Sequence, residues 1–475
     1  MTPCILVELV ARISGVETTL YISTKGYTTS PADTPANTVY LPAISGGVAL
    51  TEEITIDGSA AISYGDIEVY NVYGERDAWL DYVWSSRSIK IYSGFLESAR
   101  STFSLVFDGV VEDIAASSRD RLNIKIRDKL QRLNSPVSDT KLGGTTSNAD
   151  SVLPIVLGEV CNITPLLTNP ATLEYQVHDG AIEAIIEVRD NGVPIVTFTP
   201  SLTTGKFILT AAPAGVITCS IQGSKPVVYS DTVGALVQLL ATSYGKSATR
   251  FITSDLDVAA LATFESAHTM AVGIYLQNRE NVISVMQSLA ASIGAVVTIT
   301  RAGKLSLLQI ALPATATTTI TNIDMVEASI NIVLRVPVRS AVKIGYCKNW
   351  TVQSNLQSGI PESNKVLLSN EFLSVTQSNS TVATAYKLDA EPIQRDTFLI
   401  ETAAATAEAA RDVALYSTPR TIYGFEGTSR LMSLVLGQAV TITHARFGLS
   451  AGKSGIVTKL SPDWINNRVQ VEVII

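Results

Sequence analysis

DGVVEDI (Asp108–Ile114) opens a segment that returns near the end of the chain; the polar turn AASSRD and RLNIKI (Arg121–Ile126) complete it. The second copy reads SGIVTKL (Ser454–Leu460), the turn SPDWINN and RVQVEV (Arg468–Val473). In both copies, apolar and polar residues alternate on either side of the turn, which is the period of a strand with one buried face. The sequence therefore predicts two related β-hairpins, one in each half of the chain.

Similar strands lead into both hairpins, SRSIKIYSGF (Ser86–Phe95) in the first half and LGQAVTITHARFGL (Leu436–Leu449) in the second. One alternative is coincidence, because amphipathic hairpins with a glycine and a polar turn are common. We favour two related small β-barrels, since self-similarity within a chain is a signal of fold. Two barrels per chain give a ring of n chains 2n quasi-equivalent barrels, so a trimer would offer six.

The composition points to assembly with other subunits. The chain has 475 residues, of which 46% are hydrophobic and only 16% are charged. A single core stops growing at about 250–300 residues, so several domains are expected. Apolar surface without charge is usually hidden in a membrane or against other subunits. No segment reaches the roughly 20 uninterrupted apolar residues of a spanning helix, which leaves subunit contacts as the prediction.

The charge balance disfavours a dedicated nucleic-acid binder. Lys and Arg total 35 against 43 Asp and Glu, which gives a net charge of -8. A cluster of aromatic residues is interleaved with acidic residues rather than with Lys and Arg, so it predicts a core or a subunit contact instead of a base-stacking platform. Its members are Tyr64, Tyr70, Tyr73, Trp79, Tyr82, Trp84 and Tyr92.

Helical periodicity stands out against this β-rich background. One amphipathic helix is expected after Asp231 as its N-cap, with Gly245 as the stop, and a second from near Asn278 to a C-cap at Gly294. AVVTITRAGKLSLLQI (295–310) reads as two strands joined by a turn. Weaker helices are expected over 77–84 and 402–416, a linker over 134–153 and a surface loop over 354–366.

These patterns predict a mainly β fold with an α+β insert, divided into five segments. The segments are an N-terminal β-barrel (1–135), a linker with a small β module (136–225), an α+β domain (226–345), a loop-rich α+β segment (346–415) and a C-terminal β-barrel (416–475). The N-terminus lacks the basic head of a secretory signal, so we expect a protein made and assembled in the cytoplasm.

GLSAGKSG (Gly448–Gly455) superficially resembles a phosphate-binding loop. Such a loop needs G-x-x-x-x-G-K-[ST] before a helix, so that backbone amides surround the phosphates. Here the first glycine stands one residue too close to Gly452-Lys453-Ser454, and a strand pattern follows. The residues therefore predict a turn between strands rather than a nucleotide site.

Other chemistry-bearing residues are scattered along the chain. The histidines are His178, His268 and His444, and the cysteines are Cys4, Cys161, Cys219 and Cys347. Neither set has the short spacing of a metal site. Asp66 with Glu68 and Glu112 with Asp113 are candidate carboxylate pairs, but nothing distinguishes them from solvated strand charges. A triad built from distant residues stays open as an alternative. We predict no catalytic, cofactor-binding or metal-ligating residues and no enzyme.

Five segments together resemble the tail-tip (baseplate) hub proteins of long-tailed bacteriophages and of phage-derived gene-transfer particles. The similar segments are Phe107–Val137, Pro154–Leu167, Tyr175–Ile195, Ala211–Gly223 and Leu436–Ile474. Some tail-tip proteins of the lambda type carry a cysteine cluster for an iron–sulfur centre, and this chain departs from that pattern. The departure agrees with the prediction that no metal is bound.

The resemblance implies a structural virion protein at the tail tip. It implies a ring, usually a trimer, that adapts the six-fold tail tube to a three-fold central fibre or spike and rearranges for genome ejection. Expected partners are other copies of the chain, the distal tail protein, the tail tube and the tape-measure protein. DNA would pass through the ring without specific binding, past an acidic lining. The alternatives are a hexameric distal tail protein that attaches side fibres and, from another class, a carbohydrate-binding β-protein.

Overall fold

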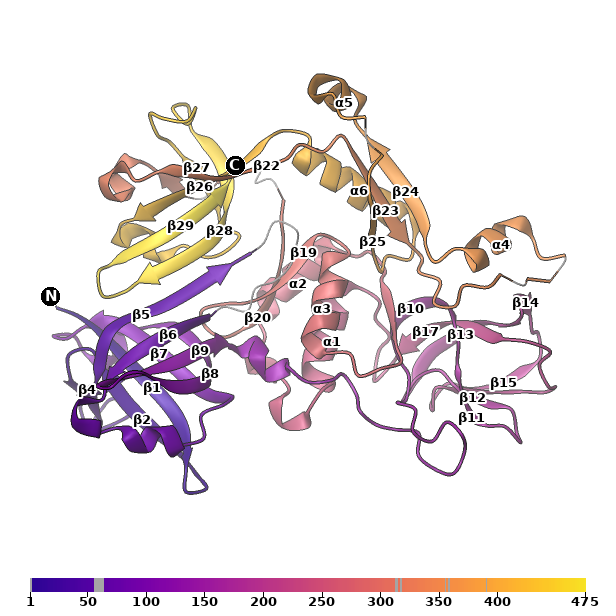
Figure 1. The fold of residues 1–475 in the computed structure, drawn as a ribbon, viewed down its shortest axis with the longest axis horizontal. Coiled ribbons are helices and arrows are strands. Elements are labelled where there is room, and N and C mark those ends of the chain that lie inside the picture. Colours follow the sequence, from indigo (N-terminus) through magenta and orange to yellow (C-terminus); the bar gives the residue numbers. More distant parts are fainter. Residues whose placement is uncertain are drawn as a thin grey trace.

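The computed structural model describes residues 2–475 apart from 55–63, 312–314, 317, 355, 358 and 390. Its fold is mainly β, as the sequence predicts, with helices concentrated in the middle of the chain. Figure 1 shows the N-terminal strands beside the C-terminal strands, the helices α1–α3 next to both, and a separate group of strands at the far end. The two termini therefore lie in neighbouring parts of the molecule.

The first β-domain consists of β1–β9 and the short helices between them. Its core forms because apolar residues alternate along each strand: in β6, for example, Ile67 and Val69 are fully buried, whereas their polar neighbours are exposed or half-buried. Ala43 connects β2 with β6, because its N–H donates to the carbonyl of Ser23 at the end of β2 and its own carbonyl accepts from Tyr70 N at the end of β6. The strands are β1 (Pro3–Ile13), β2 (Val16–Ser23), β3 (Tyr27–Thr28), β4 (Val39–Pro42), β5 (Ile44–Glu53), β6 (Tyr64–Tyr70), β7 (Arg87–Phe95), β8 (Ser104–Ser118) and β9 (Arg121–Asp128).

The second β-domain combines the C-terminal strands with two strands from earlier in the chain. Its core includes Val457, Val471 and Val473. The strands are β21 (Thr318–Ile320), β22 (Asn331–Val336), β26 (Arg420–Gly427), β27 (Ala439–Ile442), β28 (Lys453–Asp463) and β29 (Arg468–Ile474). β21 and β22 fall inside the segment predicted as the α+β domain, yet β21 pairs with β27 and β22 with β26. Such long-range pairings are not encoded in local periodicity.

The predicted repeat is present in the strand order of the two β-domains. The first contains the neighbours β6-β9-β8-β7, and the second contains β26-β29-β28-β27, antiparallel throughout. A β-bulge interrupts both hairpins at the same place, between Val111 and Asp113 and between Val457 and Lys459. The two hairpins are therefore equivalent residue by residue up to their turns.

The backbone geometry that the two hairpins share explains why each has a glycine at the same position. A Cβ at Gly109 would overlap the carbonyl oxygen of Arg127 on β9, and one at Gly455 would overlap that of Ile474 on β29. These two carbonyls occupy equivalent places in the partner strands. Close approach of the backbones thus requires glycine at the same position of both repeats.

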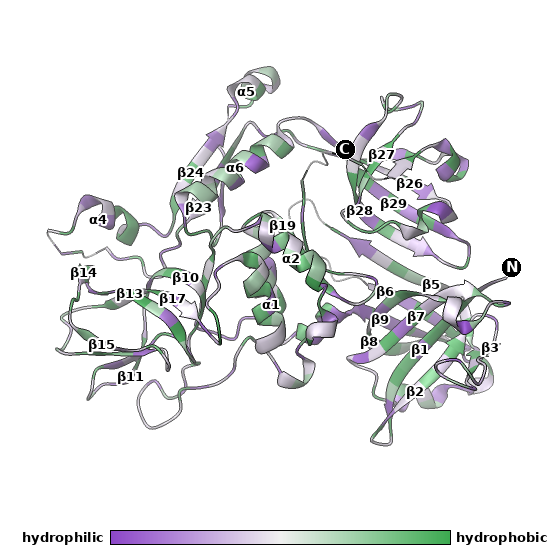
Figure 2. Ribbon diagram, turned by 180° about the vertical axis from the view of Figure 1, so that it is seen from behind, coloured by the Kyte–Doolittle hydropathy of each residue, from purple (hydrophilic) through white to green (hydrophobic). Residues whose placement is uncertain are grey.

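The helical part lies against the first β-domain and confirms the two strong helix predictions. α1 spans Val233–Ser243 with Thr232, rather than the expected Asp231, as N-cap. α3 spans Val282–Ala291 after the N-cap Asn281, and its C-cap is Ser292 rather than the expected Gly294. Figure 2 shows α1 largely in the colour of hydrophobic residues, as expected for a helix within a core. The predicted hairpin follows α3. The further elements are α2 (Val258–Ala267), β18 (Gly273–Leu276), β19 (Ala295–Ile299) and β20 (Leu305–Gln309).

Two local predictions need correction. The expected helix over 77–84 is a single 3-10 turn, Asp77–Asp81, because Trp84 turns into the core of the first β-domain. The expected surface loop over 354–366 ends in a helix, since α4 (Glu362–Ser369) starts directly after Pro361; residues 355 and 358 lie outside the described residues. Proline is tolerated at a helix start because no intrahelical N–H bond is needed there.

The remaining strands form a small β module and a three-stranded sheet covered by α6. The module contains β10 (Ile155–Ile163), β11 (Leu166–Asn169), β12 (Glu174–Gln176), β13 (Ile182–Asp190), β14 (Val193–Pro194), β15 (Phe198–Ser201), β16 (Lys206–Leu209) and β17 (Ile217–Ser224). The sheet contains β23 (Ala341–Tyr346), β24 (Leu373–Ser378) and β25 (Gln394–Asp396). The helices here are α5 (Ser380–Tyr386) and α6 (Thr402–Tyr416), and α6 has the predicted bounds.

A buried histidine makes the small β module sensitive to acid. His178 is 2% exposed, its Nδ1 accepts a hydrogen bond from Val156 N at 3.0 Å, and burial lowers its pKa to about 4. The unfolded chain, with a histidine pKa near 6.5, takes up this proton first as the pH falls. Stability is therefore expected to decline by about 3 kcal/mol as the pH falls from about 6.5 to 4.

Thermal unfolding measured from pH 7 to pH 4.5 checks this expectation against His178→Asn, which removes the titrating ring. The difference in melting temperature between the wild-type protein and the variant should narrow in acid. Only the wild-type protein has the buried histidine, so only it loses stability when the unfolded chain takes up that proton. Parallel curves for the two proteins would contradict it.

Candidate assembly surface

The strands of the two β-domains form one continuous sheet, and we call eight successive strands of it the shared sheet; β7 continues the sheet beyond β8. Its order is β22-β26-β29-β28-β5-β6-β9-β8. The two domains join where β28 pairs antiparallel with β5, through Lys459 opposite Glu53 and Leu460 opposite Glu52. Ile54 N donates to Thr458 O at 2.8 Å beside these pairs. The shared sheet therefore presents strands of both repeats on one continuous surface.

The outer face of the shared sheet is mostly polar, because strands such as β29 turn their apolar residues inward. β22 is the exception, since its Ile332, Val333 and Leu334 are exposed. In β29, for example, Gln470 and Glu472 alternate with buried Val469, Val471 and Val473. Figure 2 shows the same alternation of hydrophilic and hydrophobic segments along the strands of both β-domains.

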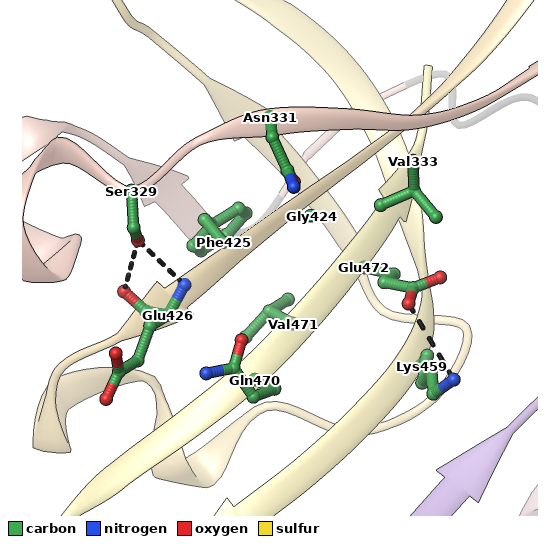
Figure 3. A pocket seen from close by; sticks show the side chains of 10 residues that line it. All are labelled: Ser329, Asn331, Val333, Gly424, Phe425, Glu426, Lys459, Gln470, Val471 and Glu472. Carbon is green, nitrogen blue, oxygen red and sulfur yellow. Dashed lines mark hydrogen bonds and ion pairs between the residues drawn. The ribbon is translucent and has the colours of Figure 1, made fainter.

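Two shallow cavities occupy equivalent places on this face. The cavity of the second β-domain has a volume of about 290 Å³, and Figure 3 shows Asn331, Gln470 and Glu472 around it. The cavity of the first β-domain has a volume of about 490 Å³ and is lined by Asn123 and Lys125, among others. Asn123 and Lys125 correspond to Gln470 and Glu472 in the repeat. The two cavities are therefore lined by equivalent residues of the two repeats, and both open on the same face of the shared sheet.

Most cations of the outer face are neutralised by neighbouring carboxylates. Lys459 lies 3.3 Å from Glu53 and 3.7 Å from Glu472, and Figure 3 shows the second contact. Burial raises the pKa of Glu472, against the opposing charge of Lys459. The face thus carries both signs in contact rather than a field of bare cations, which leaves little to hold phosphate groups. The pairs are Arg121–Glu68, Arg127–Glu112, Lys459–Glu53 and Arg468–Glu426.

A buried tryptophan and a half-buried arginine fasten the junction behind this face. Trp464, in the turn between β28 and β29, is 4% exposed and belongs to the apolar cluster of the first β-domain. Arg301, in the turn between β19 and β20, contacts Glu52 of β5 at 3.0 Å and donates to Met432 O at 2.7 Å. Neither residue was predicted from the sequence. A tryptophan inside an otherwise polar turn was the available signal.

The structure separates most residues that sequence considerations brought together. Lys453 begins β28, so a strand follows Gly452-Lys453-Ser454 as predicted. Glu112 and Asp113 line the same cavity, because the bulge prevents these adjacent residues from facing opposite ways. Among the aromatic residues, Trp84 is buried with Trp79 and Tyr82 packed nearby, whereas Tyr73 is 96% exposed.

The histidines and cysteines lie in unrelated surroundings. His178 is buried in the small β module, His268 follows α2, and the Nδ1 of His444 accepts from Arg446 N at 3.1 Å. Cys4 and Cys219 are buried, while the sulfurs of Cys161 and Cys347 lie 3.2 Å apart. Within the described ranges, no three His, Cys, Asp or Glu side chains are grouped so that they could hold a metal ion.

None of the helices that the structure describes has the length and apolar character needed to cross a membrane.

Comparisons with known proteins give similarity to solved structures only. No model of a protein family matches the chain, and no curated protein sequence matches it. A tail protein from Neisseria meningitidis MC58 is 10% identical with a TM-score of 0.43, and the match covers 100% of this chain and 97% of that one. The 43 kDa tail protein of prophage MuSo2 from Shewanella oneidensis is 10% identical with a TM-score of 0.43, over 99% and 98% of the two chains. A chain in the virion of a native gene transfer agent particle is 13% identical with a TM-score of 0.44, over 71% of this chain and 87% of that one.

Proposed function

We propose that the protein is a structural, non-enzymatic component of a phage tail tip and that its copies form a ring, most simply a trimer. The observation that carries the proposal is the order of the shared sheet, in which the same four-strand unit occurs twice in succession. Units that join head to tail close into a ring when their rotation permits it. A trimer of two-unit chains would match a six-fold tail tube on one side and a three-fold fibre or spike on the other.

In this ring the outer face of the shared sheet lines the channel through which DNA leaves. Its ion-paired cations support this role, because a channel for DNA must not retain phosphates. The low share of charged residues, 16% of the chain, supports burial of much of the remaining surface against neighbouring tail proteins.

Native mass spectrometry of the purified protein tests the copy number. The expected species contains three copies of the 50.6 kDa chain. Six copies would favour a distal tail protein, and a single copy inside assembled tails would overturn the ring. A cryo-EM map of the ring tests the channel, where a strongly basic lumen would contradict the proposed lining. Robust turnover in an activity screen on cell-wall material would contradict the structural role.

A further inference from the structure

Two of the four cysteines meet where the small β module contacts the three-stranded sheet. Cys161 lies in β10 of the module, and Cys347 directly follows β23 of the sheet. Their sulfurs are 3.2 Å apart although 186 positions separate them in the sequence, and both thiols are free. Figure 1 shows β10 next to the ends of β23 and β25. The sulfur pair therefore lies on the boundary between two parts of the chain.

We propose that Cys161 and Cys347 are a site of redox modification: a low-molecular-weight disulfide oxidises the two thiols to a disulfide bond, which fastens the small β module to the three-stranded sheet. A chain made in a reducing cytoplasm would keep both thiols, and the bond would form after release into oxidising surroundings. Both cysteines lie outside the shared sheet, so the inference is independent of the proposed ring.

A β-bulge in β10 determines where Cys161 points. Two residues of β10, Cys161 and Asn162, lie opposite the single Ser220 of β17. Asn162 has a φ of 53°, and its N–H donates to the hydroxyl of Ser220 at 3.1 Å instead of continuing the regular ladder. A bulge bends its strand and redirects the side chains beside it. Cys161 is therefore placed by an irregularity of the strand rather than by simple alternation.

The backbone of the second cysteine is irregular as well. Cys347 has a φ of 48°, in the left-handed region that residues with a side chain rarely adopt. Its N–H donates to Leu399 O at 2.7 Å. Such conformations persist only where surrounding contacts enforce them, and they are frequent at functional sites. Unfavourable backbone geometry thus occurs on both sides of the sulfur pair.

Buried hydrogen bonds hold the two segments side by side. The side-chain amide of Asn162 donates to Asn349 Oδ1 and to Thr351 O, both at 2.7 Å. Asn162 and Asn349 are 0% and 1% exposed. Trp350 N also donates to Cys161 O at 3.4 Å. These contacts involve neither sulfur, so oxidation of the thiols leaves them in place.

A small reagent can reach this pair but not the other cysteines. Cys161 is half-buried and Cys347 is 9% exposed, whereas Cys4 and Cys219 are both 0% exposed. The hydrogen bond between the paired thiols lowers the pKa of Cys347 and raises the pKa of Cys161. Cys347 therefore supplies the thiolate, which is the reactive form of cysteine. Burial raises the pKa of Cys4 and of Cys219, so oxidation of the native chain should be confined to the pair.

The oxidation consists of two thiol–disulfide exchanges. The thiolate of Cys347 attacks one sulfur of the small disulfide, forms a mixed disulfide and releases a small thiolate, which takes up the proton that Cys347 lost. Cys161 then loses its proton and attacks the sulfur of Cys347, which breaks the mixed disulfide and releases the second small thiolate to take up that proton. Two protein thiols are oxidised, and one small disulfide is reduced to two thiols.

Oxidised glutathione added to the full, native chain tests the site. Peptide mapping by mass spectrometry should find one linkage, from Cys161 to Cys347, and thiol titration of the denatured product should find two of the four thiols. The matched control Cys4→Ala/Cys219→Ala should form the same linkage, whereas Cys347→Ala should form none. Glutathione adducts on the pair without a linkage, or equal oxidation of all four cysteines, would overturn the proposal.

Thermal unfolding measures whether the bond fastens the two parts. The oxidised wild-type chain should unfold about 4–8 °C above the reduced chain, because the bond restricts the unfolded state over a long loop. Cys347→Ala should show no difference between the two conditions, which separates the effect of the bond from that of the reagent. A linked chain with an unchanged melting temperature would overturn the fastening. Neither measurement depends on the copy number of the ring.

Discussion

Trp464→Ala is expected to lower the free energy of unfolding of the joined β-domains by about 3–5 kcal/mol. The indole is 4% exposed, and it comes from the second β-domain but fills the apolar cluster of the first. Truncation leaves a cavity at a junction held otherwise by a short strand pairing between β28 and β5. Both the denaturation midpoint and resistance to limited proteolysis between the two β-domains should therefore fall.

Tyr73→Ala is the matched control for this truncation, because Tyr73 is an aromatic residue with 96% of its surface exposed. Its effect should stay within about 0.5 kcal/mol. Equal effects of the two substitutions would show that Trp464 does not fasten the junction.

Arg301→Ala is expected to cost about 3–5 kcal/mol, because it leaves the carboxylate of Glu52 buried without its partner. Glu52 is 6% exposed and contacts Arg301 Nε at 3.0 Å. The same guanidinium donates to Met432 O, so one side chain connects the helical part to both β-domains. Thermal unfolding of the variant should show a lower and broader transition.

The control for Arg301 is Arg279→Ala, which breaks an ion pair with Asp139 whose side chains are 62% and 73% exposed. Such a pair contributes about 0–1 kcal/mol. Replacing both Glu52 and Arg301 by apolar residues should recover much of the loss, since no unpaired charge then remains. Failure of the double replacement to recover stability would assign the loss to packing rather than to the buried charge.

Local patterns predicted the elements that depend on local periodicity. The two hairpins, α1, α3 and α6 were all predictable, because each has an apolar face at the period of its structure. α2 was not predicted: among its ten residues only Leu261 and Phe264 are buried, and alanines fill half of the other positions. A pattern with so few large apolar residues gives little helical signal.

Features that depend on contacts between distant segments were not predictable from one sequence. β22 shows no alternation, since all residues from Asn331 to Arg335 are exposed, and its role emerges only from its pairing with β26. Arg301 belonged to an unremarkable turn. The repeat could be predicted because the two similar segments are both visible in the sequence. The pairing of β28 with β5 could not, because it depends on the relative position of the two β-domains in space.

The join of β28 with β5 places both copies of the four-strand unit in one sheet of one chain. The two copies therefore cannot be gained or lost separately, and any assembly of this chain contains first and second β-domains in equal numbers. A fragment that carries only the first β-domain would leave the edge of β5 without the strand that covers it in the full chain.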